Sequence, residues 1–202
     1  MANRITWTFL FAFAALQSSY AASTVNRRHL VLKVLDELSQ MLTANKEKYK
    51  NVFQLVIDEA ELTLPTESQG SILPKLKELI RRIDSVDNDD FIELRNLGDA
   101  LEEIKKTLEL SESKEFESAA DKVIVKLYIK HGVDLKVILD KNLETTLKVI
   151  EKKMESDMGT WSESRLARNS ELVKLFNEFK NEKDIDKKSE KIYNILDKIY
   201  NI

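Results

Sequence analysis

The sequence predicts an all-α protein, a single-domain bundle of seven or eight amphipathic helices without disulfides. Only four glycines and two prolines occur among the 202 residues, so few positions suit the tight turns that join strands. Leu, Lys and Glu, which favour helices, are abundant. Apolar residues recur at steps of three and four along most of the chain, which is the period of an amphipathic helix.

Residues 1–21 have the three-part pattern of a secretory signal peptide. One basic residue, Arg4, precedes an apolar run over residues 5–16, and small and polar residues follow. The run is much shorter than the roughly 20 apolar residues that cross a bilayer. We therefore expect cleavage after Ala21, with cleavage after Ser23 as the alternative, and a secreted, extracellular protein without stable membrane insertion.

Residues 22–202 are expected to fold as one helical domain. Loss of Arg4 reduces the 32 basic residues to 31 against 35 acidic ones, so the net charge of this part is −4. Lysines alternate with acids along the chain, which is typical of solvated helix faces and gives no concentrated basic surface for nucleic acid. The chain has no cysteine, but its length allows it to bury about 70% of the unfolded surface without disulfides.

The first helical region extends to Ala60, as one long helix or as two with a bend near Asn45. Its apolar positions are Leu35, Leu38, Met41, Leu42, Tyr49, Val52, Phe53, Val56, Ile57 and Ala60. Pro65 and Gly70 indicate a loop. Ser71 is expected to cap the next helix, with Pro74 in its first turn.

A polar stretch over residues 84–90 precedes a helix with apolar residues from Phe91 to Leu108, and Asp90 is expected to cap it. Gly98 interrupts this helix, so we expect a neighbouring helix to approach closely there. A further helix follows over residues 116–131, and Gly132 is expected to end it as a C′ residue.

The next helix is expected from Leu135 to Met158, with a stop at Gly159. Thr160 and Glu163 form a capping-box pattern before a helix with Leu166, Val173, Phe176 and Phe179. The last helix contains the repeat KIYNI one heptad apart, within residues 191–202. At about 100° per residue, Ile192, Ile195, Leu196, Ile199 and Ile202 share one side, which favours closure of the core over a partner-binding strip or a membrane anchor.

Catalytic, cofactor and metal sites are not expected. The two histidines, His29 and His131, are about a hundred residues apart and outside metal-binding motifs, and cysteine is absent. The acids Asp84, Asp87, Asp89 and Asp90 lack the ligand spacing of an EF-hand loop. Glycine-rich phosphate loops and nucleophile elbows are missing too, so we expect a protein that is not an enzyme.

Three aromatic residues are candidates for an interaction site. Trp161 is the single tryptophan after the predicted cleavage site, and it is interpreted first as a buried hydrophobic staple and second as an exposed contact anchor. Tyr193 and Tyr200 are expected along one margin of the last helix, with their hydroxyls reaching water.

The sequence therefore favours a secreted, non-enzymatic helical protein that acts as an interaction or effector module on an extracellular macromolecule. The alternative is an extracellular carrier that encloses a lipid or small hydrophobic ligand among its helices. In general character the chain resembles the Lys/Glu-rich helical secretions of invertebrate salivary, venom or reproductive glands. That resemblance implies an effector role, and it is carried by composition rather than by a motif.

Overall fold

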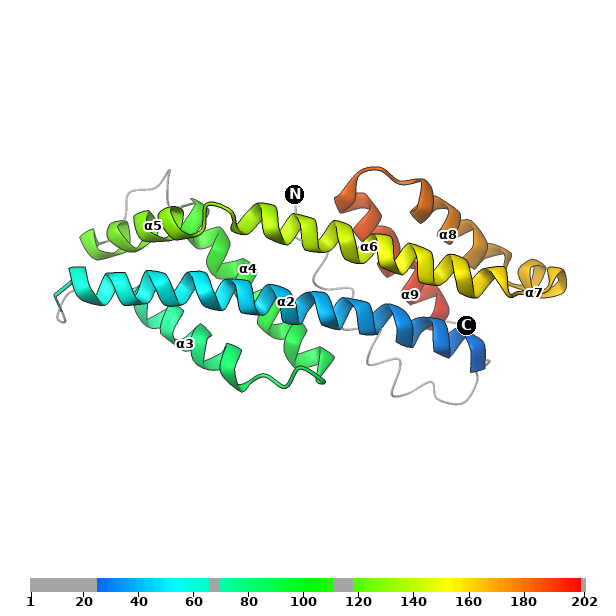
Figure 1. Cartoon of the computed structure of the whole chain (residues 1–202), viewed down its shortest axis with the longest axis horizontal. Helices are drawn as coiled ribbons and strands as arrows, with labels where there is room; N and C mark the ends of the chain where they lie inside the picture. The colour runs from blue at the N-terminus through cyan, green and yellow to red at the C-terminus, as the bar shows by residue number, and fades with distance from the viewer. Residues whose placement is uncertain (1–24, 66–69, 111–117, 201–202) are drawn as a thin grey trace. The chain divides into compact units, whose positions relative to one another are not determined.

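The computed structural model describes residues 25–65, 70–110 and 118–200, and it is an all-α helical bundle as predicted. Within these residues the chain forms eight helices and no strand (Figure 1): α2 (Val25–Thr63), α3 (Ile72–Ser85), α4 (Phe91–Leu110), α5 (Ala119–His131), α6 (Leu135–Gly159), α7 (Glu163–Arg168), α8 (Ser170–Asn181) and α9 (Ile185–Tyr200). The predicted signal peptide, residues 1–21, lies outside the described residues.

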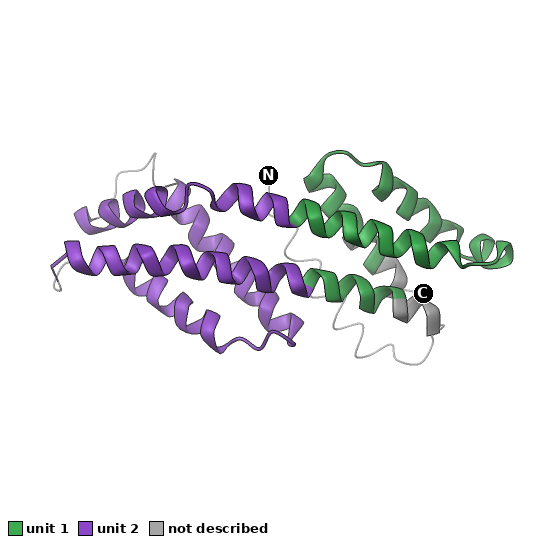
Figure 2. Ribbon diagram, in the orientation of Figure 1, with its two compact units in different colours: residues 1–38, 143–202 green, residues 39–142 purple. Residues whose placement is uncertain are grey.

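The chain divides into two compact units (Figure 2). Unit 2 is the continuous stretch Ser39–Asn142, and unit 1 combines Met1–Leu38 with Leu143–Ile202. Helices α2 and α6 contribute residues to both units. The prediction of one domain over residues 22–202 stays a prediction, because this division does not test it.

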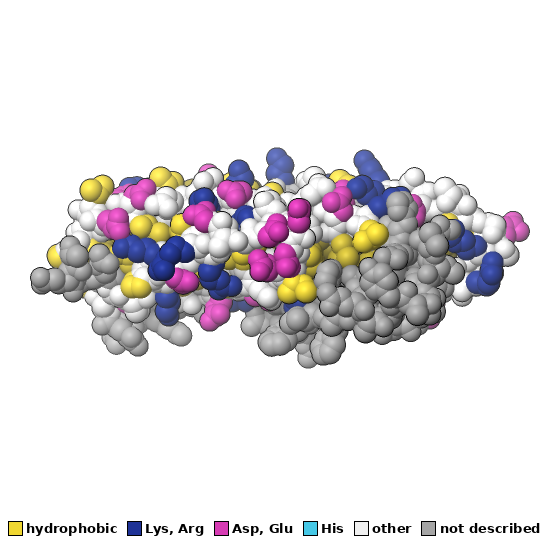
Figure 3. Space-filling view, turned by 90° about the horizontal axis from the view of Figure 1, so that it is seen from below, with side chains coloured by type: hydrophobic (Ala, Val, Ile, Leu, Met, Phe, Trp, Pro, Cys, Tyr) yellow, Lys and Arg dark blue, Asp and Glu magenta, His cyan; other side chains and the backbone are white. Residues whose placement is uncertain are grey.

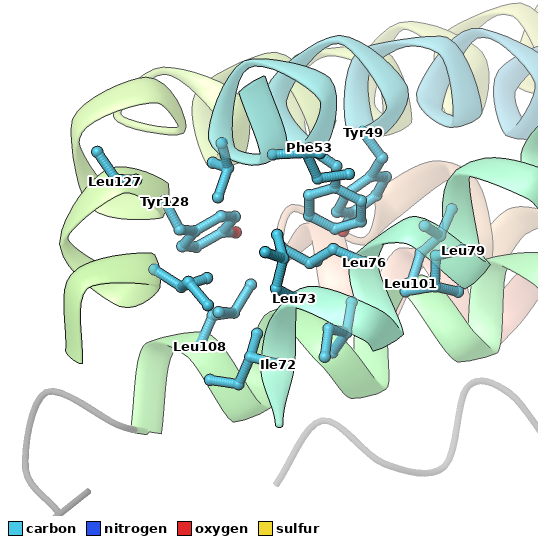
Figure 4. Close-up of a cluster of buried hydrophobic side chains, with 14 of the residues drawn as sticks. Tyr49, Phe53, Ile72, Leu73, Leu76, Leu79, Leu101, Leu108, Leu127 and Tyr128 are labelled. Carbon is cyan, nitrogen blue, oxygen red and sulfur yellow. The ribbon is translucent and has the colours of Figure 1, made fainter. Parts of the chain in front are cut away.

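Helix α2 continues without interruption through Asn45, so the first helical region is one helix of 39 residues rather than two. In unit 2 its buried face meets α3, α4 and α5 (Figure 4), and the same core includes Leu135 and Leu139 at the start of α6. The ring of Phe53 lies between two tyrosines, 5.6 Å from the ring centroid of Tyr49 and 6.3 Å from that of Tyr128. The hydroxyl of Tyr49 donates to Glu102 at 2.6 Å, and burial together with this carboxylate raises the pKa of Tyr49.

A buried carboxylate caps α3 from a different helix. Ser71 occupies the predicted N-cap position, but its own side chain does not cap the helix. Instead, Asp121 of α5 accepts hydrogen bonds from the backbone amides of Ser71 and Ile72, at 2.9 and 3.0 Å. Asp121 also accepts from the hydroxyl of Ser118, which in turn caps α5 by accepting from the Asp121 amide at 3.0 Å. Gly70, at φ 64°, permits this contact, because a Cβ there would collide with the Asp121 carboxylate.

Helix α4 begins at its predicted cap, but the expected close approach of a neighbouring helix at Gly98 is wrong. The carboxylate of Asp90 accepts from the amides of Ile92 and Glu93, at 2.9 and 3.0 Å, which confirms the cap. A Cβ at Gly98, however, would meet only the Leu42 side chain, at an ordinary 3.7 Å. A close helix approach therefore does not explain this glycine.

Gly132 ends α5, but for a different reason than predicted. Its φ is −97°, outside the left-handed region that a C′ glycine usually adopts. A Cβ at this position would lie 2.8 Å from the carbonyl oxygen of Tyr128, which is too close for a backbone atom to accommodate. Glycine is needed here because the backbone of the last turn is near.

The connection after α6 differs from the prediction in two places. The capping box of Thr160 and Glu163 does not form, because the hydroxyl of Thr160 donates back to the carbonyl of Asp157 at 2.6 Å and Ser162 occupies the N-cap of α7. The single helix expected next is divided into α7 and α8 at Asn169. The Asn169 side chain donates to the carbonyl of Arg165 at 2.7 Å, a local bond that competes with regular helix geometry.

The core of unit 1 includes the predicted apolar face of the last helix. Ile192, Ile195 and Leu196 of α9 are buried, and α9 packs against α8. The side chain of Ile199, and residue Ile202 as a whole, lie outside the described part of the structure. Other buried apolar residues of this unit are Leu30, Val31, Val34, Leu35, Leu38, Leu147, Ile150, Met154, Met158, Trp161, Leu172, Phe176 and Phe179.

Ion pairs join α6 to three other helices of unit 1. On one side, Lys153 pairs with Glu37 and Asp157 with Lys33 of α2. On the other side, Glu155 pairs with Lys180 of α8 and Glu151 with Lys188 of α9, at 2.5 and 2.6 Å. Basic and acidic side chains are also interspersed on the face of the molecule that Figure 3 shows, as the alternating sequence pattern predicts.

Candidate functional site

Of the three predicted interaction residues, the structure describes the side chain of Trp161. Trp161 is buried, 6% exposed, and the guanidinium of Arg165 lies 4.1 Å from the centre of its ring. It directly precedes the N-cap of α7, where a hydrophobic staple residue stands. Its burial agrees with the staple interpretation, and a role in partner binding stays a prediction. Tyr193 and Tyr200 belong to α9, but their side chains lie outside the described part of the structure.

His131 takes part in a polar cluster between α5 and α2. Its Nε2 lies 2.7 Å from Oε2 of Glu59, and Nζ of Lys130 lies 2.7 Å from the same oxygen. Hydrogen bonds from Lys130 and then His131 lower the pKa of Glu59. His131 is also the last residue of α5, a position that suits a histidine because of the helix dipole. The side chain of His29 is outside the described part.

The polar stretch before α4 uses its side chains for local contacts. Asp84 pairs with Lys50, the side-chain oxygen of Asn88 accepts from Lys46 at 2.5 Å, and Asp87 accepts from the amide of Asp89 at 2.9 Å. Among the described residues, groups of three or more metal-ligating side chains do not occur. This stretch is thus a set of caps and pairs that supports the start of α4.

A mixed basic and apolar surface lies on the outward side of α5. We define the α5 surface as Lys122, Lys126, Ile129, Lys130 and Val133, the last of which follows the helix. All five residues are exposed. They face away from the core because α5 buries the opposite side of the helix, which carries Ala120, Ile124, Leu127 and Tyr128.

The apolar part of the α5 surface contains two of the six large hydrophobic side chains that are exposed in the described residues. Ile129 is 42% exposed and Val133 73% exposed, and Val137 at the start of α6 is 66% exposed. Of the six large hydrophobic side chains that are exposed in the described residues, five belong to unit 2: Leu55, Leu62, Ile129, Val133 and Val137. Exposed aliphatic side chains beside charged ones are a common feature of interaction surfaces.

The basic part of the α5 surface departs from the alternating charge pattern. Between Lys122 and Val133 the chain has no acidic residue. Among the described residues, Lys122 and Lys126 form no ion pair, whereas Lys130 pairs with Glu59. Residues 119–142 contain five lysines and three aspartates, a net charge of +2, and one of those aspartates, Asp121, is buried. This segment therefore has a sign opposite to that of the whole chain, which carries −3.

The sequence contains the lysines of the α5 surface but does not distinguish a solvated helix face from a binding face. Lys122, Lys126 and Lys130 recur at steps of four, and lysines in helices are usually part of a solvated face. The structure shows that these lysines share their side of the helix with Ile129, because the opposite side of α5 is buried.

Comparison with known proteins finds no matching family model, no similar curated protein and no similar solved structure. In the described part of the chain, the helices are all too short or too polar to span a membrane.

Proposed function

We propose that this protein is a secreted, non-enzymatic interaction module that binds an extracellular macromolecule through the α5 surface. The observation that carries the proposal is the row of three lysines beside exposed aliphatic side chains on one helix face, of which Lys122 and Lys126 form no ion pair with the described residues. Apolar side chains supply binding free energy when the partner covers them and removes them from water. Charges orient the partner and speed association.

The rest of unit 2 supports this role by holding α5 in place. Leu127 and Tyr128 are buried in the core, and the buried carboxylate of Asp121 joins the start of α5 to the start of α3. A binding surface on a helix fixed in this way loses little conformational entropy when a partner binds.

Secretion is supported by the signal-peptide pattern of residues 1–21 and is tested at the N-terminus. The full chain should be expressed in secretory cells, and the protein recovered from the medium should be sequenced. We expect Ala22 as the first residue. Recovery of a chain that still contains the apolar run would contradict an extracellular function.

The binding role is tested against the carrier alternative by native mass spectrometry of the secreted protein. An interaction module should appear at the mass of the chain alone, whereas a carrier should retain a lipid or another hydrophobic molecule in near-stoichiometric amount. The same protein, with a photo-crosslinking residue at Val133 or at the exposed control position Lys48, is then incubated in the fluid into which it is secreted.

A saturable macromolecular adduct from position 133, lost when Lys122 and Lys126 are changed to glutamate and missing from position 48, supports the proposal. A stoichiometric lipid, or equal adducts from both positions, would reject it.

A further inference from the structure

Resting on the proposed function, we propose that the partner of the α5 surface is an acidic amphipathic helix of another protein, with carboxylates at every fourth position. Three features of the α5 surface lead to this chemistry: the spacing of its lysines, the position of its aliphatic residues, and the ion pair of Lys130.

The lysine spacing fits a helix rather than an irregular acidic segment. Lys122, Lys126 and Lys130 follow one another at steps of four within α5, so they are about 6 Å apart along the helix axis. Residues at steps of four form the ridge by which one helix commonly packs into the groove of another. Aspartates or glutamates at the same step on a partner helix would place carboxylates at the same interval.

The aliphatic residues predict an apolar row on the same partner helix. At about 100° per residue, Ile129 lies only about 20° from Lys122 around the α5 axis. Val133 extends the apolar contact beyond the end of the helix. A partner side chain such as leucine next to the acidic row would cover these two residues while the carboxylates reach the lysines.

The ion pair of Lys130 predicts that the three lysines contribute unequally to binding. Both carboxylate oxygens of Glu59 accept from its Nζ, at 2.8 and 2.7 Å, although 59% of the Lys130 side chain remains exposed. A partner carboxylate therefore competes with Glu59 at this position. Lys122 and Lys126, which form no ion pair with the described residues, should contribute more to binding.

Anionic membranes and nucleic acid fit the α5 surface less well. An interfacial helix lays a continuous apolar face into the lipid, but the apolar face of α5 is already buried in the core, and Ile129 and Val133 alone are left for lipid. Nucleic-acid surfaces combine many basic residues, often arginines, with aromatic rings for stacking. The α5 surface has three lysines and neither of these other residue types.

The test uses the full secreted chain and a synthetic helical peptide with glutamates at every fourth position beside a row of leucines. A second peptide has the same composition in scrambled order, and vesicles of phosphatidylserine with phosphatidylcholine and a DNA duplex represent the other partners. The protein variants are Lys122→Glu with Lys126→Glu, and the control Lys48→Glu with Lys75→Glu, which reverses two exposed lysines elsewhere in unit 2.

We expect the ordered peptide to bind the native chain more tightly than the scrambled one, and binding to weaken with salt. Reversal of Lys122 and Lys126 should reduce affinity about tenfold or more, and the control should leave it within about twofold. Circular dichroism confirms that each variant is folded. If the reversal does not fold, Lys122→Gln with Lys126→Gln replaces it, with an expected loss of about fivefold.

Equal affinity of both peptides, equal affinity of native and reversed chains, or tighter binding to the vesicles or the DNA would overturn the proposed partner. These results leave the interaction module standing if native mass spectrometry finds the chain without lipid. A stoichiometric lipid would instead reject the interaction module itself.

Discussion

The two units use polar side chains in different ways. In unit 1, ion pairs connect α6 to α2, α8 and α9, and their side chains are partly exposed; the Lys33 and Asp157 side chains, for example, are 34% and 16% exposed. In unit 2, ion pairs such as Lys50 with Asp84 and Lys130 with Glu59 also join helices, but the difference is the buried carboxylate of Asp121, which accepts from two backbone amides and two hydroxyls.

This difference predicts which polar contacts contribute most to the free energy of unfolding. Partly exposed ion pairs contribute at most about 1 kcal/mol each, and salt weakens them. A buried acceptor that satisfies the free amides at a helix start is worth more, because its loss leaves those amides unpaired. Unit 1 should therefore depend mainly on its apolar core, and unit 2 on its core together with one polar contact.

The largest expected effect is Ile195→Asp in the core of unit 1. Ile195 is fully buried, so the change places a charge without a partner among apolar side chains and should destabilise the protein by about 4 kcal/mol. Chemical denaturation followed by the fluorescence of Trp161, which lies in unit 1, measures it. The exposed neighbour changed as Asn194→Asp should cost less than about 0.5 kcal/mol, and a similar cost for both would show that α9 does not close the core.

The next effect concerns the polar contact of unit 2. Asp121→Ala removes the acceptor for the amides of Ser71 and Ile72 and should cost about 3 kcal/mol. Asp140→Ala, at an exposed acid within α6 of the same unit, is the matched control and should be close to neutral. Hydrogen exchange should show the loss of protection first at the start of α3. A cost below about 1 kcal/mol would mean that unit 2 does not depend on this carboxylate.

The same carboxylate predicts a pH dependence. Burial raises the pKa of Asp121, but hydrogen bonds from Ile72, Ser118 and Ser71 together outweigh it and lower the pKa below its ordinary value. Its stabilising contribution is therefore complete above the unfolded-state pKa of about 4 and is lost as pH falls through the lower folded-state value. In urea titrations between pH 5 and pH 2, Asp121→Asn should lose less stability than the native chain. Parallel curves for the two proteins would count against this account.

A smaller effect, of opposite sign, is expected inside α4. Gly98→Ala adds a Cβ that meets only Leu42 at 3.7 Å, so it should stabilise unit 2 by about 0.5–1 kcal/mol through helix propensity. Gly132→Ala is the contrasting variant, and it should destabilise because of the nearby Tyr128 carbonyl. Thermal unfolding measures both. A lower melting temperature for Gly98→Ala would reveal a constraint on α4 that the structure does not show.

The smallest effect tests the ion pairs of unit 1. A double-mutant cycle with Lys33→Met and Asp157→Asn should give a coupling energy of about 0.5 kcal/mol at low salt and almost none at high salt. A coupling above about 2 kcal/mol that persists in high salt would remove the contrast between the units, because such a pair would behave like a buried contact.

Apolar periodicity was enough to predict most of the helices and their buried faces, because both depend on neighbours within about two turns. Ile192, Ile195 and Leu196 illustrate this, and so does the cap at Asp90, where donor and acceptor are three residues apart. The break at Asn169 was missed, since an asparagine in a helical pattern has no fixed consequence until its side chain finds a carbonyl.

Contacts between residues far apart in the sequence could not be predicted from the sequence. Asp121 caps a helix that begins 49 residues earlier, and the sequence does not indicate which acid will meet Ile72. The pairing of His131 with Glu59 was missed for the same reason. The α5 surface could not be predicted without knowing which side of α5 is buried, because lysines at steps of four have the same sequence pattern on a solvated face and on a binding face.

The order in which the two units occur along the chain has a consequence for synthesis. Unit 2 is one continuous stretch and is complete once Asn142 has left the ribosome, but unit 1 needs the residues from Leu143 onward. At about 5–20 residues per second, those last residues take several seconds to appear. During that time the buried residues Leu30, Val31 and Val34 lack the second segment of their unit. The nascent start of α2 therefore stays without the rest of its unit while residues 143–202 are made, which makes it a segment that a chaperone could protect.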